Sequence, residues 1–285
     1  MKPELLITTN GFKGTWPAIE YGAWLAATMQ TKVLLLGVTE RLNPAQIDDH
    51  HPLDEVFARA SELFQQKGLE YNLEIQNGDA EDVIPRKAKE GNFITVVGPL
   101  GRPQIRHWLI GRSIRHFMEM IAGPILYVPG LRLPLNKLLI GVGGLGYEVA
   151  AENLAFQLAV VNQAEVTLLH VVPPVDLDYP TTRAVRENWK HLVDTDTLPG
   201  RYLRQALVTA EEAGLKASVN VRRGNVVEEI LAEMKEGNYD LVCMGSPYSA
   251  NALRQLYVPN VTADVAEVAH CPVLTARHKR EDLPT

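Results

Sequence analysis

Short apolar runs alternate with longer amphipathic segments along the whole chain. The runs at Leu138–Val142 and Leu241–Gly245 are apolar at nearly every position, a pattern typical of strands that are covered on both faces. Between such runs, apolar residues recur three or four positions apart, which predicts helices with one buried face. These helical positions are Val56, Ala60, Leu63 and Phe64; Ala80, Val83 and Ile84; Ile114, Phe117, Met118 and Ile121; Leu203, Leu207 and Ala210; and Val227, Ile230, Leu231 and Met234.

The pattern occurs twice, about half a chain apart. The stretch KEGNFITVVG from Lys89 returns as KEGNYDLVCMG from Lys235, and ELLITTNGF from Glu4 returns as KLLIGVGGL from Lys137. Further matches pair Lys32 with Glu165, Gly78 with Gly224, and Ala122 with Ala269. Each copy reads as strands alternating with helices. The sequence therefore predicts an α/β fold of two tandem doubly wound open sheets, nucleotide-binding-like, each with about five mostly parallel strands and helices on both faces.

The predicted domain limits follow from this repeat. A chain of 285 residues can form two domains, which we expect at 1–132 and 136–280, with a polar tail at 281–285. The linker is short, about Pro129 to Asn136. One longer irregular stretch, Pro173 to Pro199, follows the second strand of the second copy and contains a possible helix at Arg183 to Val193. It is either a partly ordered excursion over the binding edge or a partner surface, or a mobile loop.

Composition excludes several classes of protein. No apolar run reaches eighteen residues, and the N-terminus lacks a signal-peptide pattern, so we expect a cytoplasmic protein with no membrane segment. The net charge of -6 argues against a surface dedicated to nucleic acid. Cys243 and Cys271 show no metal-site or disulfide spacing. We expect both to be small core residues of a protein in a reducing compartment.

The stretch Gly98 to His116, GPLGRPQIRHWLIGRSIRH, offers the strongest candidate chemistry. Gly98 and Gly101 permit a tight turn and close approach of a ligand to the backbone. Gly111 and the residues after it would present unpaired N–H groups at a helix start, which favours phosphate. Four arginines add positive charge before the first acidic residue: Arg102, Arg106, Arg112 and Arg115. The alternative is that these are ordinary turn glycines and a solvated helix face.

The spacing Gly98-x2-Gly101-x9-Gly111 resembles the ATP-binding loop of universal stress proteins, whose motif is G-x2-G-x9-G-[ST]. The segments LLHVV from Leu168 and HCPVLTA from His270 are similar to further patterns of that family. The similarity covers nearly the whole chain as a tandem pair. It implies a member of this family that takes part in the stress response.

The resemblance also implies a site for ATP, with or without Mg²⁺, in the first domain. Val38 would meet the adenine edge, and Asn10 stands where the family has an aspartate at the end of the first strand. Arg112 stands where the family has Ser or Thr, and Ser113 comes one place late. The implied cofactor-binding residues are Thr8, Asn10, Val38, Gly98, Gly101, Arg102, Gly111, Arg112 and Ser113.

The second copy departs from the motif. Its loop keeps Gly245, but Tyr248 occupies the second glycine position and Pro259 removes one backbone N–H. Gly143 takes the place of the acidic residue. We therefore expect the second domain to bind ATP weakly or not at all.

These features predict a nucleotide-binding sensor or regulator with an unidentified protein partner. No residue is placed as a nucleophile or base and no metal site is predicted, so at most slow ATP hydrolysis is expected. The alternative is an interaction scaffold that binds no nucleotide and in which both loops are degenerate. The last strands of the two copies, Ile125 to Val128 and Val273 to Ala276, could pair within the chain as a pseudo-dimer, and a homodimer is also possible.

Overall fold

The computed structural model describes residues 2–41, 49–101, 112–143, 149–174, 184–185, 187–246 and 260–277, without the side chains of residues 112, 113, 246 and 277. By its internal contacts the chain divides into two compact units, Met1–Arg132 with Ala266–Pro272, and Leu133–Val265 with Val273–Thr285. We call residues 1–132 the first half and the remainder the second half.

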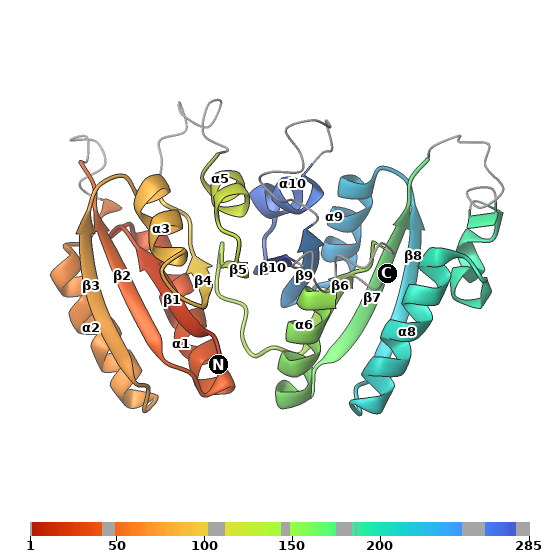
Figure 1. Ribbon diagram of the computed structural model, residues 1–285, viewed down its shortest axis with the longest axis horizontal. Coiled ribbons are helices and arrows are strands. Elements are labelled where there is room, and N and C mark those ends of the chain that lie inside the picture. Colours follow the sequence, from red (N-terminus) through yellow and green to blue (C-terminus); the bar gives the residue numbers. More distant parts are fainter. Residues whose placement is uncertain are drawn as a thin grey trace. The chain divides into compact units, whose positions relative to one another are not determined.

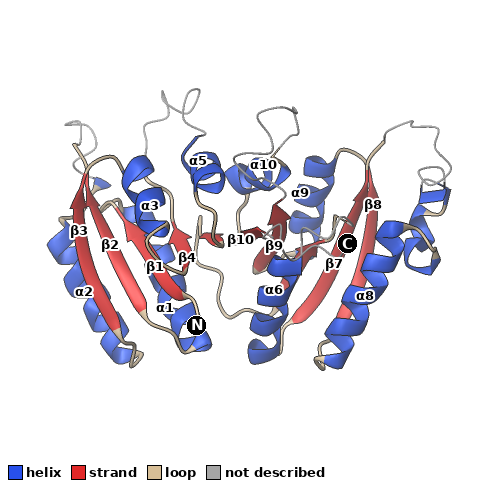
Figure 2. Cartoon of the chain, viewed as in Figure 1, coloured by secondary structure: helices blue, strands red, loops and turns tan. Residues whose placement is uncertain are grey.

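The first half is a parallel sheet with the strand order β3-β2-β1-β4-β5. Helices α1 and α2 contact each other on one face, and α3 and α5 do so on the other (Figures 1 and 2). In chain order the elements are β1 (Glu4–Thr9), a 3-10 turn η1 (Lys13–Thr15), α1 (Trp16–Met29), β2 (Val33–Thr39), α2 (Leu53–Gln66), β3 (Tyr71–Asn77), α3 (Ala80–Ala88), β4 (Phe93–Val97), α5 (Arg112–Met120) and β5 (Ile125–Tyr127).

The second half repeats this plan with the order β10-β9-β6-β7-β8, again all parallel. Its elements are β6 (Lys137–Gly141), α6 (Val149–Asn162), β7 (Glu165–Val172), the 3-10 helix η4 (Trp189–Asp194), α8 (Leu198–Glu212), β8 (Ala217–Arg223), α9 (Val226–Gly237), β9 (Leu241–Ser246), α10 (Val261–Val268) and β10 (Val273–Arg277). The predicted doubly wound α/β architecture is confirmed.

The core lies between the central strands and the helices on each face. Leu5, Leu6 and Ile7 on β1 are fully buried although successive side chains point to opposite faces, because helices cover both faces. In and directly after α5, the residues predicted to face the core are all buried, whereas the predicted positions Leu63, Leu207, Val227 and Leu231 of other helices are only half-buried. Cys243 and Cys271 are buried, as expected. Across the described part of the chain, no helix is long and apolar enough to cross a membrane.

The described end of the irregular stretch packs onto α8. This helix begins at Leu198, so Pro199 lies in its first turn and not in a loop. In place of a continuous helix up to Val193, residues Trp189–Asp194 form a 3-10 helix. Arg204 holds this segment against α8 by donating to the carbonyl oxygens of Val193 and of Thr195, the latter at 2.6 Å. Contacts from the side chain of Arg204 therefore join the residues at 193–195 to α8.

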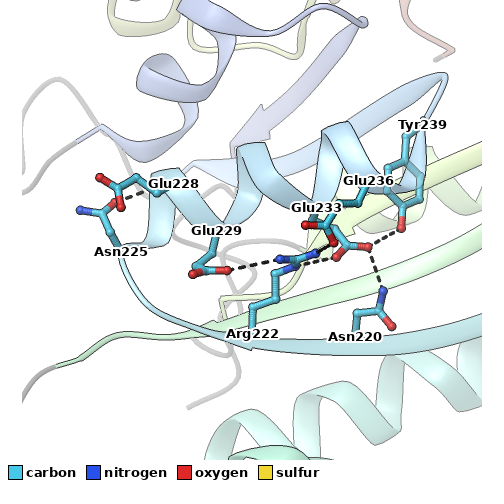
Figure 3. A network of polar contacts seen from close by, with 8 residues as sticks. All are labelled: Asn220, Arg222, Asn225, Glu228, Glu229, Glu233, Glu236 and Tyr239. Atoms are coloured by element: carbon cyan, nitrogen blue, oxygen red, sulfur yellow. Dashed lines mark hydrogen bonds and ion pairs between the residues drawn. The ribbon is translucent and has the colours of Figure 1, made fainter.

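A network of charged side chains joins β8 to α9 (Figure 3). The carboxylate of Glu233 is buried and accepts hydrogen bonds from Arg222 Nε at 2.6 Å, Tyr239 Oη at 2.7 Å and Asn220 Nδ2 at 2.8 Å. Arg222 also pairs with Glu236, whose side chain is 66% exposed. Burial opposes ionisation of Glu233, but the hydrogen bonds from Tyr239, Arg222 and Asn220 outweigh it and lower its pKa.

The first half also has an ion pair between its outer strand and the helix that covers it, but the charges are reversed. On β3, Glu74 accepts from Lys87 of α3, with 2.7 Å between Oε2 and Nζ, and Lys87 also pairs with Glu90 at 2.9 Å. The helix supplies the cation here and the anion in the second half. The outer strand and the helix that covers it are thus joined by charge in both halves, with the signs reversed.

Replacing Glu233 by Gln should lower the free energy of unfolding by about 2 kcal/mol, because it leaves charged and polar donors facing an amide in a buried place. The matched change Glu236→Gln removes an exposed partner of the same arginine and should cost no more than about 0.5 kcal/mol. Urea denaturation of the full chain near neutral pH measures both. Equal losses in the two variants would contradict the assignment of Glu233 as the central acceptor.

The contribution of Glu233 should also depend on pH. Because its folded-state pKa lies below the ordinary value of 4.5, its stabilisation is complete above that value and is lost as the pH falls through the folded-state pKa. We therefore expect the difference in unfolding free energy between wild type and Glu233→Gln to be constant from about pH 7 to about pH 5 and to shrink in more acid solution. A difference that grew on acidification would have the wrong sign.

Candidate functional site

The order of strands creates a switch point between β1 and β4 of the first half. Strands β2 and β3 lie on one side of β1, whereas β4 and β5 lie on the other, so the connections leave the carboxyl ends of β1 and β4 in opposite directions. Ile7 pairs with Val96 near those ends. Crevices at such points are the usual ligand sites of open α/β sheets. The residues that follow β1, β2 and β4 therefore define the candidate site.

Asn10 joins the ends of three strands at this point. Asn10 is buried, with 6% of its surface exposed. Its side-chain amide donates to Oε2 of Glu40, which follows β2, at 2.7 Å, and to the carbonyl oxygen of Leu100, which follows β4, at 3.1 Å. Its Oδ1 accepts from the backbone N–H of Phe12 at 3.1 Å. Both N–H groups of the amide are thus used within the chain, so a hydrogen bond to a ribose would use the second lone pair of Oδ1.

Glu40 carries this connection on to α3. Its Oε1 accepts from the backbone N–H of Ala80, the first residue of the helix, at 2.9 Å. A carboxylate is favourable there because the first N–H groups of a helix have no partner within it and the helix dipole is positive at that end. Glu40 is not among the site residues that the sequence predicts. Its only local signal is an acidic residue directly after an apolar strand.

Thr8 and Val38 are predicted site residues that the fold buries completely. Thr8 Oγ1 donates to the carbonyl oxygen of Val96 at 3.1 Å and so fastens β1 to β4. Neither side chain is exposed at the edge of the sheet. A contact between Val38 and a ligand would have to use the backbone.

The two described motif glycines have reasons within the chain for lacking a side chain. A Cβ on Gly98 would lie 3.1 Å from Thr15 Cα and 3.2 Å from Ala18 Cβ, so glycine lets the end of β4 pack against the start of α1. Gly101 has a φ of 66°, and a Cβ there would lie 2.3 Å from Cδ2 of Phe12. The room predicted for a ligand at Gly101 is occupied by an aromatic ring.

The phosphate end of the predicted site is only partly described. Arg102 and Gly111 lie outside the described residues. Arg112 and Ser113 form the first turn of α5, as the resemblance implies for the residues after the last glycine, and their side chains are not described. The predicted contacts of these four residues with phosphate therefore stay predictions.

The second half closes the corresponding edge differently. Gly143 follows β6, and the ends of β6 and β7 are joined by buried His170, whose Nδ1 lies 2.7 Å from the Val142 carbonyl oxygen. After β9, the carbonyl oxygen of Gly245 accepts from Thr262 Oγ1 at 3.2 Å. Tyr248 and Pro259 lie outside the described residues, so the predicted loss of ATP binding in this half stays a prediction.

Comparison with known proteins gives consistent matches. A family model described as the universal stress protein family matches residues 134–277, which is 144 of the 285 residues. Universal stress protein YxiE of Bacillus subtilis (strain 168) is 26% identical over 147 residues, covering 50% of this chain and 99% of that protein. Universal stress protein Slr1230 of Synechocystis sp. is 22% identical over 306 aligned positions, covering 96% of this chain and 99% of that protein.

A solved structure supports the fold over the full length. The crystal structure of a universal stress protein from Archaeoglobus fulgidus DSM 4304 superposes with a TM-score of 0.70 at 15% identity, covering 98% of this chain and 97% of that one. The similarity in sequence is too low to carry more than the fold. The family model matches the second half, although the loop after Gly245 departs further from the glycine motif than the loop of the first half does.

The contact of Gly101 with Phe12 can be isolated by a matched pair of substitutions. Gly101 and Gly68 have nearly the same φ, 66° and 65°, but a Cβ on Gly68 meets nothing within 4 Å. Gly68→Ala should cost about 1 kcal/mol from the left-handed backbone alone. Gly101→Ala should cost about 1 kcal/mol more, because the methyl group must displace the ring. Thermal or chemical denaturation measures both, and equal losses would show that the ring does not constrain Gly101.

Proposed function

The chain belongs to the universal stress protein family, and we propose that its first half binds an adenine nucleotide and thereby acts as a sensor or regulator in the stress response. The observation that carries this proposal is the convergence at Asn10 of the segments after β1, β2 and β4, at the switch point of the sheet. Open α/β sheets bind ligands at this place. The proposed nucleotide domain comprises residues 1–132 and the second domain residues 136–280.

The chemistry of the edge suits the two ends of a nucleotide. Asn10 Oδ1 can accept a hydrogen bond from a ribose hydroxyl or a base amino group beside the end of β1. On the other side of the switch point, Gly101 follows β4, and the next described element is α5, whose first backbone N–H groups suit phosphate oxygens. Arg112 and Ser113 belong to that first turn. When Mg²⁺ accompanies the nucleotide, it neutralises phosphate charge.

The proposed role is binding and not catalysis. Phosphoryl transfer needs a positioned base or water and ligands for the metal. Two polar side chains at the edge, Asn10 and Glu40, are bonded to each other and to backbone groups of the fold. We therefore assign them to holding the site, with at most slow hydrolysis of bound ATP.

One observation favours a second candidate function. Gly98 and Gly101 are each explained by packing within the chain, against α1 and Phe12, without any ligand. Had the loop lost its ligand during evolution, the same glycines would still be required. An interaction scaffold that binds no nucleotide is the alternative that this packing supports.

Nucleotide binding can be tested and placed in one experiment on the full chain. Isothermal titration of ATP with Mg²⁺ should give one site per chain. In backbone amide NMR spectra, the signals of Asn10, of 98–101 and of 112–114 should then move on titration. The corresponding segments of the second half, 245–246 and 260–262, serve as the internal control and should stay in place. Saturable binding that moved only the second set would place the nucleotide in the wrong half, and no binding would favour the scaffold.

A further inference from the structure

We propose that the side chain of Phe12 competes with the ligand for the candidate site: its ring covers Gly101, and a ligand must displace the ring to reach that glycine from the same side. This inference rests on the proposed function, because it takes Gly101 to be a place where a ligand meets the backbone. It adds a regulatory contact from the segment after β1, whereas the motif glycines Gly98 and Gly101 follow β4.

The ring fits a slot made by two glycines. An ideal Cβ on Gly101 would lie 2.3 Å from Cδ2 and 2.7 Å from Cε2 of Phe12, whereas one on Gly14 would lie 2.5 Å from Cε1 and 3.0 Å from Cδ1. Opposite edges of the ring therefore face the two glycines. The ring of His50 lies beside it, with 5.4 Å between ring centroids. The slot exists because neither glycine has a side chain.

The ring covers the side of Gly101 that a side chain would otherwise occupy. This is the side on which glycine permits close approach to a backbone. Atoms already in van der Waals contact leave no room for a further group between them, and an apolar ring offers phosphate oxygens no hydrogen bond. A ligand that reaches the backbone of Gly101 from this side and the Phe12 ring thus exclude each other.

The backbone of Phe12 is fixed, so the ring moves alone. Its N–H donates to Asn10 Oδ1 at 3.1 Å, and its carbonyl oxygen accepts from Thr15 N at 2.9 Å and from Thr15 Oγ1 at 2.7 Å. Rotation about the side-chain torsions leaves all of these bonds intact. Phe12 is half-buried, so part of its side chain meets solvent, and we take the ring to leave Gly101 by rotating toward that side.

The consequence for affinity follows from the population of the open rotamer. When the binding-competent form is only a fraction of the molecules, the apparent dissociation constant rises by the inverse of that fraction. A ring that covers Gly101 for about nine-tenths of the time would weaken binding about tenfold. Changes that hold the ring in place or release it then tune the affinity for the ligand without altering the contacts that the ligand makes.

The test compares Phe12→Ala with the matched control Phe93→Ala in the full chain. Phe93 is also half-buried and its ring also covers a glycine, Gly91, at 2.6 Å from the ideal Cβ, but it lies at the opposite, amino end of β4. Isothermal titration with ATP and Mg²⁺ should show about tenfold tighter binding for Phe12→Ala and unchanged binding for Phe93→Ala. Circular dichroism melting curves should show that both variants are folded.

A second measurement follows the ring in the wild-type protein. Nuclear Overhauser contacts between the Phe12 ring and the Gly101 Hα should be present without ligand and disappear when ATP and Mg²⁺ are added. Unchanged or weaker binding in Phe12→Ala, or contacts that persist at saturation, would overturn the proposed role of the Phe12 ring while leaving nucleotide binding in place. If neither the wild type nor Phe12→Ala binds ATP or inorganic triphosphate, both the proposed role of the Phe12 ring and the proposed function are overturned.

Discussion

The side-chain amide of Asn10 is the interaction on which the candidate site depends. The strand order sends the chain in opposite directions from the ends of β1 and β4, so the segments beyond those ends are held together by contacts outside the strand pairing. Asn10 does so through short hydrogen bonds to Glu40 and to the Leu100 carbonyl oxygen. A neutral amide suits this position, because an acid in its place would put a second carboxylate beside Glu40 and would lose the donors.

The motif glycines illustrate how one residue type can satisfy two demands. Gly98 brings the end of β4 close to α1, and Gly101 accommodates an aromatic ring. Both features are complete without a ligand, so the glycine spacing alone cannot establish binding. What connects the spacing with function is its place at the switch point, together with the family to which the chain belongs.

Local pattern was sufficient to predict the fold, and distant contacts explain what it could not predict. The positions of α2, α3, α5, α8 and α9 follow from apolar periodicity, because each helix buries one face against the sheet. By contrast, Glu40 meets Asn10 across thirty positions and Phe12 meets Gly101 across 89, and no short-range pattern encodes such pairs. Likewise, the contacts of Arg222 with Glu229, Glu233 and Glu236 were not predicted from the sequence, because they form only where β8 lies against α9.

The reversed charges under α3 and α9 have a consequence for a chain that contains two copies of one plan. Lys87 and Glu233 occupy matching positions when Gly78 is set against Gly224. If α3 docked on β8, its lysine would meet Arg222, and α9 on β3 would bring Glu233 against Glu74, so each exchange would create like-charge repulsion. Duplicated modules in one polypeptide can assemble with each other's parts as they emerge from the ribosome. Here the two copies carry opposite charges at matching positions, so each covering helix is complementary in charge only to the outer strand of its own half.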